Sequence, residues 1–437
     1  MNYRKLKVLL IVEQCNPEWA SVPLEGYNYY HEISQRADVT LVTHERNKSA
    51  LEKTANNENI IYITEAKWVE HYYNIVSKIT ASGRINWPLQ HALTYPIYAQ
   101  FNHRVYQQFK QQVKEQHYDV VHAITPMMPR YPAKIVRACQ NTPFILGPVN
   151  GGVPFPAGFK TIAKQEFVQY NFLKKIGRNL IPGYVETYRK ADKILAGSSY
   201  TLKMLQKIFN LPKHKIDLFY ENGITANFLT KYPKEISKND KVNLLFVGRL
   251  VPYKGADMLI EAIAQLKESD RAKIRLNIVG DGSEKSDLQQ RVEKFNLSNI
   301  VNFVGWVQQG ETLEYYRRSD IFCFPSIREF GGAVVLEAMA SGLPCIVVNN
   351  GGIGEYVTET NGFKIEPISR EHIVRELGNK IEYLLENKDI LKQMSSESIA
   401  RAKEFEWGVK AEKIAAIYQD VIAEKQHLKV IEQPSFA

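Results

Sequence analysis

The stretch from Ser319 to Gly342, SDIFCFPSIREFGGAVVLEAMASG, predicts one strand, one turn and one helix. The apolar run IFCF has the length of a buried strand, and AVVLEAMA has the composition of a helix. Residues 329–332 then form the turn at the carboxyl end of the strand. Glycines let a ligand approach the backbone of such a turn, and the N–H groups at a helix start attract anions. The stretch therefore predicts a βα unit of a parallel sheet, with a ligand site at its turn.

The same alternation of apolar runs and amphipathic stretches covers the whole chain, which is typical of doubly wound parallel sheets. Strands are expected at 7–13, 38–44, 59–64, 119–124, 143–147, 193–197 and 215–219, and then at 242–248, 274–280, 299–305, 320–326 and 344–349. The sequence becomes polar between 228 and 241, so we place a linker there. We expect an α/β protein with two Rossmann-like domains, 1–227 and 242–405, that face a cleft. A helix over 406–425 is expected to pack back on the first domain.

The charge of the chain is uneven. Residues 1–230 hold 28 Lys and Arg against 17 Asp and Glu, a net +11, while the remaining residues hold 28 against 30, a net −2. A basic surface suits nucleic acid, an anionic membrane or phosphorylated ligands, and it also serves solubility alone. The basic residues are dispersed without a nucleic-acid-binding motif, so no nucleic-acid partner is expected.

Cysteine usage and the N-terminus indicate an intracellular globular protein. The four cysteines are far apart and include no CxxC pair, so neither a zinc site nor a disulfide framework is expected. The apolar run Val8 to Val12 meets Glu13 without a cleavage site, which favours a first strand over a signal peptide. No segment approaches the length of a membrane span.

Two glutamates frame the glycine turn of the opening stretch. Glu329 is expected to project from the loop, and Glu337 lies about one turn inside the helix. Acids near a helix start are also favoured by the helix dipole, by a few tenths to about 1 kcal/mol. However, the surroundings of Glu337 are apolar, and burying an unpaired charge costs several kcal/mol, so this side chain needs partners. The two acids could accept hydrogen bonds from two groups of hydroxyls on either side of a bound phosphate.

A second turn follows a strand at Val247 to Gly255, VGRLVPYKG. Arg249 and Lys254 can converge there on one anion, the guanidinium as a fork and the ammonium as a point charge. A solvated basic loop is the alternative. A pyrophosphate is an anion that needs such neutralisation.

The motifs GRLVPYKG, IVGDGSEKSDL, GWV and EFGGAVVLEAMASGLPCIVVNNGGIGE together resemble the C-terminal domain of family-4 retaining glycosyltransferases of the group 1 type, which have the GT-B fold. The spacing of Glu329 and Glu337 matches the E-x7-E motif of that family. The resemblance covers nearly all of residues 242–405. The first half resembles the family more weakly, through GPVNGG, DVVHAI and ENGI.

The resemblance implies that the second domain binds a nucleoside-diphosphate sugar and the first domain the acceptor. Arg249 and Lys254 would bind the diphosphate, Glu337 the ribose and Glu329 the hydroxyls of the transferred sugar. Trp306 either contacts the nucleobase or belongs to the core. The other implied donor contacts are Gly248, Val307, Phe330, Gly331, Gly332 and Ala333.

In the first domain, strand ends mark further candidates. His122 is either a core histidine or a catalytic residue that contacts the donor sugar or positions the acceptor. Asn150 and Gly151 either line the cleft or serve a tight turn. Family members commonly have a Gly-Gly loop after the first strand, but this chain has Glu25 before Gly26. We therefore expect Glu25 to face the acceptor and leave Gly26 as the phosphate contact.

The resemblance implies a metal-independent hexosyltransferase that needs no cofactor and retains the anomeric configuration. Its catalytic residues would be Glu329, Arg249, Lys254 and His122, and Asp281 is expected to be a turn residue rather than a metal ligand. The acceptor would be a saccharide or a lipid-linked saccharide in polysaccharide, glycolipid or cell-envelope glycan synthesis. The basic stretch 172–178, FLKKIGR, suits either an anionic membrane or a solvated helix face. We expect a cytoplasmic protein, peripheral on the inner face of the plasma membrane.

Three other classes of protein compete with this function. A nucleotide-sugar epimerase could share the architecture but would not require the E-x7-E spacing. A nicotinamide-dependent dehydrogenase would need G-x-G-x-x-G after the first strand, which residues 13–26 lack. A non-catalytic nucleotide-sugar-binding protein would keep the fold and lose the charged residues, yet all four are present.

Overall fold

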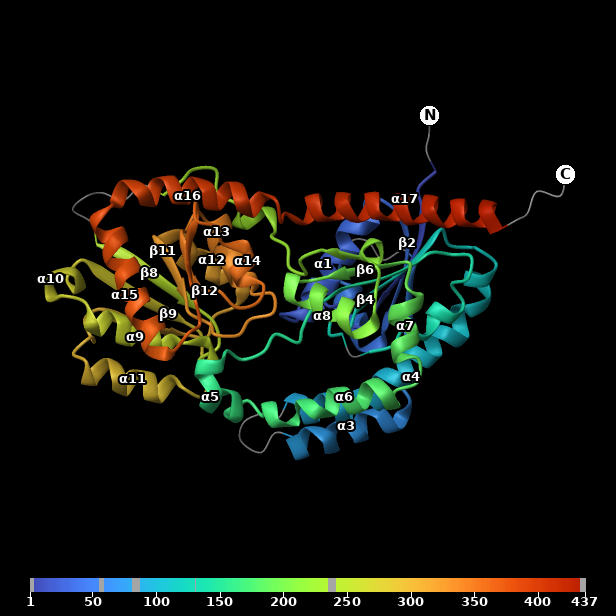
Figure 1. The fold of residues 1–437 in the computed structure, drawn as a ribbon, viewed down its shortest axis with the longest axis horizontal. Helices are drawn as coiled ribbons and strands as arrows, with labels where there is room; N and C mark the ends of the chain where they lie inside the picture. Colours follow the sequence, from blue (N-terminus) through green and yellow to red (C-terminus); the bar gives the residue numbers. More distant parts are fainter. Residues whose placement is uncertain (1–3, 55–58, 81–86, 130, 235–240, 433–437) are drawn as a thin grey trace. The chain divides into compact units, whose positions relative to one another are not determined.

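The computed structural model describes residues 4–54, 59–80, 87–129, 131–234 and 241–432. Their contacts divide the chain into two compact units (Figure 1). Unit 1 comprises Met1–Gly152, Lys164–Glu221 and Lys410–Ala437, and unit 2 comprises Val153–Ala163 and Asn222–Val409. A short segment from the first half of the sequence is thus part of unit 2, and the last helix belongs mainly to unit 1.

Unit 1 is built on a seven-stranded sheet with the order β3-β2-β1-β4-β5-β6-β7, in which all neighbours are parallel. The central strands are apolar on both faces, as expected for a sheet that helices cover on both sides. The strands are β1 (Lys7–Val12), β2 (Asp38–His44), β3 (Ile60–Ile63), β4 (Val120–Thr125), β5 (Phe144–Val149), β6 (Lys193–Ala196) and β7 (Ile216–Leu218).

The α-helices of unit 1 are α1 (Val22–Ser34), α2 (Lys48–Leu51), α3 (Lys67–Thr80), α4 (Trp87–Lys114), α6 (Phe172–Leu180), α7 (Tyr184–Lys190), α8 (Ser199–Phe209) and most of α17 (Trp407–Glu432). Short 3-10 helices are η1 (Glu45–Asn47), η2 (Lys134–Arg137), η4 (Val168–Asn171) and η5 (Lys213–Lys215). The start of α8 is capped by Ser198, whose hydroxyl accepts a hydrogen bond from the amide of Thr201. Such local signals set the helix boundaries.

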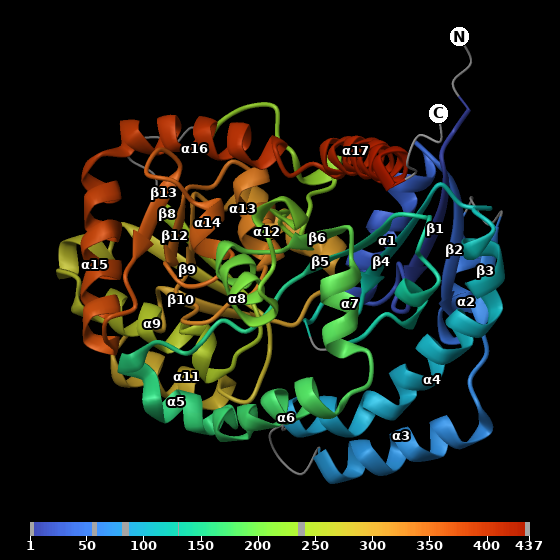
Figure 2. The same cartoon turned by 45° about the vertical axis from the view of Figure 1, so that its right-hand side comes forward.

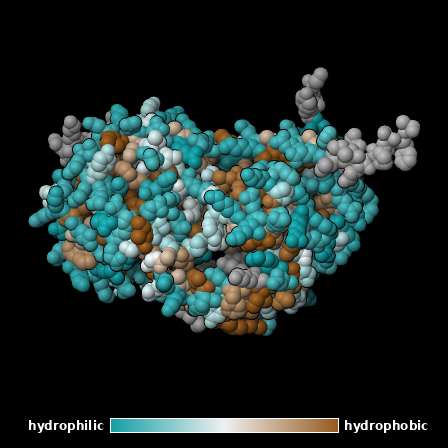
Figure 3. Space-filling model, viewed as in Figure 1, coloured by the Kyte–Doolittle hydropathy of each residue, from teal (hydrophilic) through white to brown (hydrophobic). Residues whose placement is uncertain are grey.

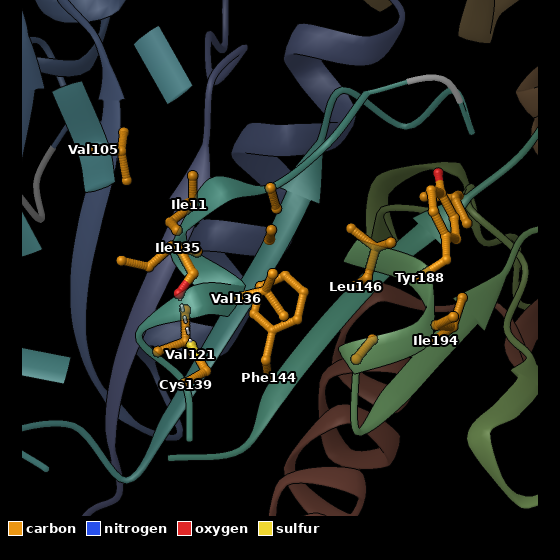
Figure 4. Close-up of a cluster of buried hydrophobic side chains, with 14 of the residues drawn as sticks. Ile11, Val105, Val121, Ile135, Val136, Cys139, Phe144, Leu146, Tyr188 and Ile194 are labelled. Carbon is orange, nitrogen blue, oxygen red and sulfur yellow. Dashed lines mark hydrogen bonds between the residues drawn. The ribbon is translucent and has the colours of Figure 1, made fainter. Parts of the chain in front are cut away.

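The core of unit 1 lies between the middle of the sheet and the elements that cover it. Figure 4 shows Val121 of β4 and Phe144 of β5 beside Ile135 and Val136 of η2, and Ile194 of β6 beside Tyr188. All four cysteines of the chain are buried and free, and Cys139 lies in this core with its thiol directed at the carbonyl of Ile135. The cysteines are therefore packing residues in this structure.

Unit 2 repeats the plan with a six-stranded parallel sheet of order β10-β9-β8-β11-β12-β13. Its strands are β8 (Val242–Val247), β9 (Ile274–Val279), β10 (Val301–Gly305), β11 (Ile321–Phe324), β12 (Cys345–Val348) and β13 (Gly362–Ile365). Its α-helices are α9 (Ala256–Gln265), α10 (Glu268–Arg271), α11 (Lys285–Lys294), α12 (Gln309–Arg318), α13 (Ala333–Ala340), α14 (Ile353–Tyr356), α15 (Arg370–Glu386) and α16 (Lys388–Lys403). The 3-10 helices are η3 (Ala157–Phe159), η6 (Ala226–Phe228) and η7 (Pro252–Lys254), and α5 (Lys160–Gln165) crosses the boundary between the units.

The predicted fold class is confirmed: each unit is a doubly wound parallel sheet, and all twelve expected strands form. The strand β13 was not expected. Part of the predicted linker, residues 235–240, lies outside the described residues, and β8 begins at Val242. Figure 2 shows the helices of each unit packed around its sheet.

Candidate active site

The loops that carry the predicted donor residues follow two adjacent strands of unit 2. Strands β8 and β11 pair in the middle of the sheet, where the strand order changes direction. In doubly wound sheets, the carboxyl ends of the strands at this switch point are where ligands bind. Arg249 and Lys254 follow β8, and Glu329 follows β11. The topology therefore brings together residues that lie 75 positions apart in the sequence.

Lys254 and Glu329 form an ion pair between these two loops. The pair is largely shielded from solvent, with exposed side-chain fractions of 11% and 16%. The ammonium of Lys254 also lies 5.0 Å from the centre of the Phe324 ring. Ser326 donates a hydrogen bond to the same carboxylate oxygen of Glu329 at 3.3 Å. Both predicted site residues are thus held in place by the unit itself, which favours preorganisation for an anionic ligand.

Glycines allow the loop after β11 to lie close to the loops after β8 and β12. Gly255 has φ +75°, and a Cβ atom there would lie 2.4 Å from the carbonyl oxygen of Pro325. Gly351 has φ +85°, and a Cβ atom there would lie 1.8 Å from the carbonyl oxygen of Glu329, with which it forms an isolated β-bridge. A side chain at either position would force the loops apart.

Arg249 lies on the same loop as Lys254, with Tyr253 between them. The guanidinium of Arg249 donates to the Tyr253 hydroxyl at 2.7 Å, and the ammonium of Lys254 lies 5.5 Å from the centre of the Tyr253 ring. Tyr253 therefore contacts both cations and limits the space between them. Tyr253 was not predicted from the sequence, although its position between two residues expected to bind an anion was a usable signal.

The predicted glycine turn leads directly into α13. Gly332 caps the helix in the left-handed conformation with φ +72°, and the amide of Gly352 donates to the carbonyl of Phe330 at 3.0 Å. Gly331 is buried, while Ala333 is partly buried at the first position of the helix. The predicted turn and helix start are confirmed, and the turn is braced by the loop after β12.

Glu337 is 5% exposed, and one of its oxygens accepts a hydrogen bond from the hydroxyl of Tyr316 at 2.9 Å. Tyr316 is fully buried, and burial together with the charge of Glu337 raises its pKa well above the usual range. The sequence indicated that this acid needs a partner, and the structure shows one inside the unit. A ribose is therefore not required to explain the buried carboxylate, and its contact with Glu337 stays a prediction.

Trp306 follows β10 and is 72% exposed, so it is not a core aromatic. Val307 is half-buried next to it, and Gly248 is half-buried at the end of β8. A Cβ atom on Gly280 would lie 2.0 Å from the carbonyl oxygen of Gly248, so the ends of β8 and β9 meet closely. An exposed indole at this edge of the sheet is able to stack on a planar ligand.

A cluster around Arg328 was not expected from the sequence. Its guanidinium carbon lies 4.8 Å from the ring centre of Phe155 and 4.7 Å from that of Phe330, and its Nε donates to the carbonyl of Val153 at 2.8 Å. Asn350 donates to the carbonyl of Pro154 at 3.1 Å. These contacts explain why the segment Val153–Ala163 packs with unit 2, beside the loop that carries Glu329.

His122 lies in the core of unit 1 and is fully buried. One ring nitrogen is 2.8 Å from the hydroxyl of Tyr418 on α17, and the other is 2.7 Å from the carbonyl of Gly147. Burial lowers its pKa to about 4, so the ring is neutral at pH 7. The placement is that of a core histidine that ties α17 to the sheet. The predicted contact with a donor sugar would require these hydrogen bonds to break.

Asn150 and Gly151 form a hydrogen-bonded turn in unit 1. The side-chain oxygen of Asn150 accepts from Ser198 at 2.9 Å and from Thr201 at 2.8 Å, and Asn150 is 2% exposed. The amide of Gly151 donates to the Thr201 hydroxyl at 3.1 Å. These contacts account for Asn150 and Gly151 as residues of a tight turn. Their contact with a ligand stays a prediction.

Glu25 lies in the first turn of α1, and Gly26 follows it in the same helix. A Cβ atom on Gly26 would lie 2.2 Å from the carbonyl oxygen of Gln14, so close packing against the loop after β1 requires this glycine. Glu25 lies near the buried Lys410 of α17. Burial lowers the pKa of Lys410 to about 7, and the charge of Glu25 acts in the opposite direction. Glu25 therefore has a structural role, since its charge favours the protonated form of Lys410 on α17. Its contact with the acceptor stays a prediction.

Comparison with known proteins gives the same picture for unit 2. Residues 229–401 match the family described as glycosyl transferases group 1. An uncharacterized glycosyltransferase of Methanocaldococcus jannaschii is 31% identical over 241 residues, which cover 50% of this chain and 60% of the relative. The D-inositol 3-phosphate glycosyltransferase of Corynebacterium glutamicum is 29% identical over 218 residues, covering 48% and 51%. The matched region thus spans about half to three fifths of these relatives.

Solved structures resemble the whole chain in fold. The structure of Anabaena HepE in complex with UDP aligns with a TM-score of 0.59 at 19% identity, covering 95% of this chain and all of that one. The lipopolysaccharide outer core galactosyltransferase WaaB aligns with a TM-score of 0.62 at 16% identity, with coverage of 95% and 100%. At this identity the likeness concerns the fold. Residues 229–401 therefore match the glycosyl transferases group 1 family, and the chain has the GT-B fold, with two parallel-sheet α/β domains.

Proposed function

We propose that the protein transfers a hexose from a nucleoside-diphosphate sugar to a hydroxyl acceptor. One observation carries the proposal: a shielded Lys254–Glu329 pair lies at the switch point of a group 1 glycosyltransferase domain, with Arg249 on the same loop. The names of the relatives support it, and HepE was solved with UDP and with UDP-glucose.

The two cations would hold the diphosphate, which becomes the leaving group. Negative charge develops on this group as the bond between the sugar and the diphosphate breaks, and preorganised cations stabilise that charge. Arg249 would bind it through its planar fork, and Lys254 as a compact charge. The amides of Gly331, Gly332 and Ala333 at the start of α13 would add hydrogen bonds. This device supports a reaction without a metal ion.

The two glutamates would hold the neutral parts of the donor. Glu329 would accept hydrogen bonds from hydroxyls of the transferred sugar while it keeps Lys254 oriented. Glu337, whose carboxylate also accepts from Tyr316, would accept a hydrogen bond from the ribose. Trp306 and Val307 would contact the base, and Gly248 and Phe330 would line the donor.

The anomeric configuration would be retained. The acceptor oxygen would attack the anomeric carbon from the face that the diphosphate leaves, and a diphosphate oxygen would take the acceptor proton. One carbon–oxygen bond forms and one breaks, so neither a nucleophilic side chain nor a cofactor is needed. The acceptor would be a saccharide or lipid-linked saccharide of polysaccharide, glycolipid or cell-envelope glycan synthesis, reached from the cytoplasmic side.

The first test is a thermal-shift screen of nucleoside-diphosphate sugars. A donor at one hundred times its dissociation constant stabilises a protein by about 2.7 kcal/mol, which raises the melting temperature measurably. Donors that bind are then incubated with saccharide acceptors, and the products are separated by mass and by sugar identity. Sugar transfer supports the proposal. Conversion of the free donor into its epimer, or binding without any turnover, would overturn it.

A further inference from the structure

Exposed apolar side chains gather on one edge of unit 1. Among the described residues, fifteen large apolar side chains are exposed, and eight of them lie on α3 or within residues 170–180. On the second segment, Phe172, Ile176 and Leu180 are 53%, 44% and 72% exposed. Their spacing of four residues places them on one face of α6. A contiguous apolar face of this kind marks an interaction site on a protein surface.

The helix α3 has two apolar faces. Val69 and Val76 are buried, while Trp68, Ile75 and Ile79 are 46%, 44% and 58% exposed. Both α3 and α6 pack against α4, and Figures 1 and 2 draw all three along the same edge of unit 1. Figure 3 shows hydrophobic residues gathered at this edge. The exposed stripes of the two helices are therefore parts of one surface, which we call the α3–α6 face.

Basic residues accompany this face. Within unit 1, residues 164–180 contain four Lys and Arg against one Glu, and residues 67–80 contain two Lys against one Glu. Among the described residues, Lys67, Lys78, Lys164 and Arg178 form no ion pair. Exposed aromatic and aliphatic side chains beside unneutralised cations are the composition of segments that lie in the interface of an anionic bilayer. A protein-binding patch would instead have a core depleted in charge.

We propose that the α3–α6 face docks the protein on an anionic lipid surface. Trp68, Phe172 and Leu180 would enter the boundary between headgroups and acyl chains. The lipid phosphates would be contacted by the basic residues named above, Lys67, Lys78, Lys164 and Arg178. None of the helices in the described ranges has the length and apolar composition of a membrane span, so the attachment would be peripheral. Docking goes beyond sugar transfer, but it would bring the enzyme of the proposed function to lipid-linked acceptors.

The test is co-sedimentation of the full-length protein with vesicles, in the absence of donor and acceptor. We expect binding to vesicles of phosphatidylcholine with 30% phosphatidylglycerol, weaker binding to pure phosphatidylcholine, and loss of binding as salt increases. The variant Ile79→Ser with Phe172→Ser should partition at least about tenfold more weakly. The matched control is Tyr232→Ser with Ile368→Ser, which removes side chains that are 78% and 64% exposed in unit 2. This control should bind like the unchanged protein.

Charge-reversal variants distinguish the electrostatic contribution to vesicle binding from the contribution of the apolar side chains. Lys164→Glu with Arg178→Glu should abolish the preference for anionic vesicles, whereas Arg291→Glu with Lys294→Glu on α11 should retain it. Equal binding to neutral and anionic vesicles, or no binding to either, would overturn the proposal. So would a dimer in light scattering that the Ile79 and Phe172 substitutions dissociate, because the face would then bind a second copy. Donor binding measured by calorimetry is independent of each of these outcomes.

Discussion

Replacing Lys254 by Met removes the charge at the centre of the proposed site and keeps most of the side-chain stem. The ammonium lies in the shielded pair with Glu329 and beside the rings of Phe324 and Tyr253. A methionine fits such aromatic surroundings, so the fold should persist. The substitution therefore tests the electrostatic role of Lys254 rather than its packing.

The expected loss follows from the placement of the charge. Two unit charges 4 Å apart near a protein surface interact by about 4 kcal/mol before desolvation is counted. The substitution also leaves the Glu329 carboxylate near the diphosphate with no ammonium beside it. If a third to two thirds of the gross interaction is realised in the transition state, kcat/KM falls by roughly ten- to a hundredfold, or about 1.4 to 2.7 kcal/mol.

The assay measures kcat/KM for donor turnover, with the melting temperature as a check of folding. Lys285→Met is the matched control, because Lys285 forms an exposed ion pair with Asp281 in the same unit and such pairs contribute little. The double variant Lys254→Met with Glu329→Gln should lose less than the sum of the single variants, since the uncompensated carboxylate is gone. A Lys254→Met enzyme with kcat/KM within twofold of the unchanged protein would refute the diphosphate role.

Four further predictions follow from single features. Gly351→Ala should lower the free energy of unfolding by about 1–3 kcal/mol in chemical denaturation, because φ is +85° and the new Cβ meets the carbonyl of Glu329. Gly310→Ala is the control, because nothing lies within 4 Å of a Cβ atom there. Equal free energies of unfolding for the two variants would contradict the strain argument. Glu337→Gln should weaken nucleotide binding in calorimetry, and an unchanged affinity would remove Glu337 from the site. The pKa of His122 is lowered to about 4 from an unfolded value near 6.5, so its contribution to stability is full above pH 6.5 and declines by up to about 3 kcal/mol as the pH falls toward 4; a His122→Gln variant with the same pH dependence would contradict this. Transfer activity should survive EDTA, and its abolition would overturn the metal-independent mechanism.

The fold could be predicted because buried parallel strands are apolar on both faces and stand out in the sequence. The strand β13 could not be predicted because it is short and only partly buried, with Lys364 exposed and Phe363 half-buried in GFKI. Its strand conformation comes from parallel pairing with β12, in a register that begins with Cys345 opposite Gly362. An edge strand of this kind has little local signal, since the neighbouring strand supplies its hydrogen bonds.

The donor turns could be predicted because strand ends, glycines and charged residues coincide in the sequence. Their partners could not be, because they come from other elements. Tyr316, which binds Glu337, lies on α12, and Val153, which accepts from Arg328, comes from the first half of the chain. His122 shows a different limit. A polar residue in a buried strand suits a ligand contact and a core hydrogen bond equally, and only the position of α17 distinguishes them.

The central claim is that unit 2 holds an activated sugar by its diphosphate. Diffraction from crystals soaked with UDP-glucose and its relatives tests this claim most directly. The account predicts the diphosphate within hydrogen-bonding distance of Arg249 and Lys254, with a ribose hydroxyl at Glu337 and sugar hydroxyls at Glu329. A donor bound away from residues 249–254 and 329–337 would contradict it.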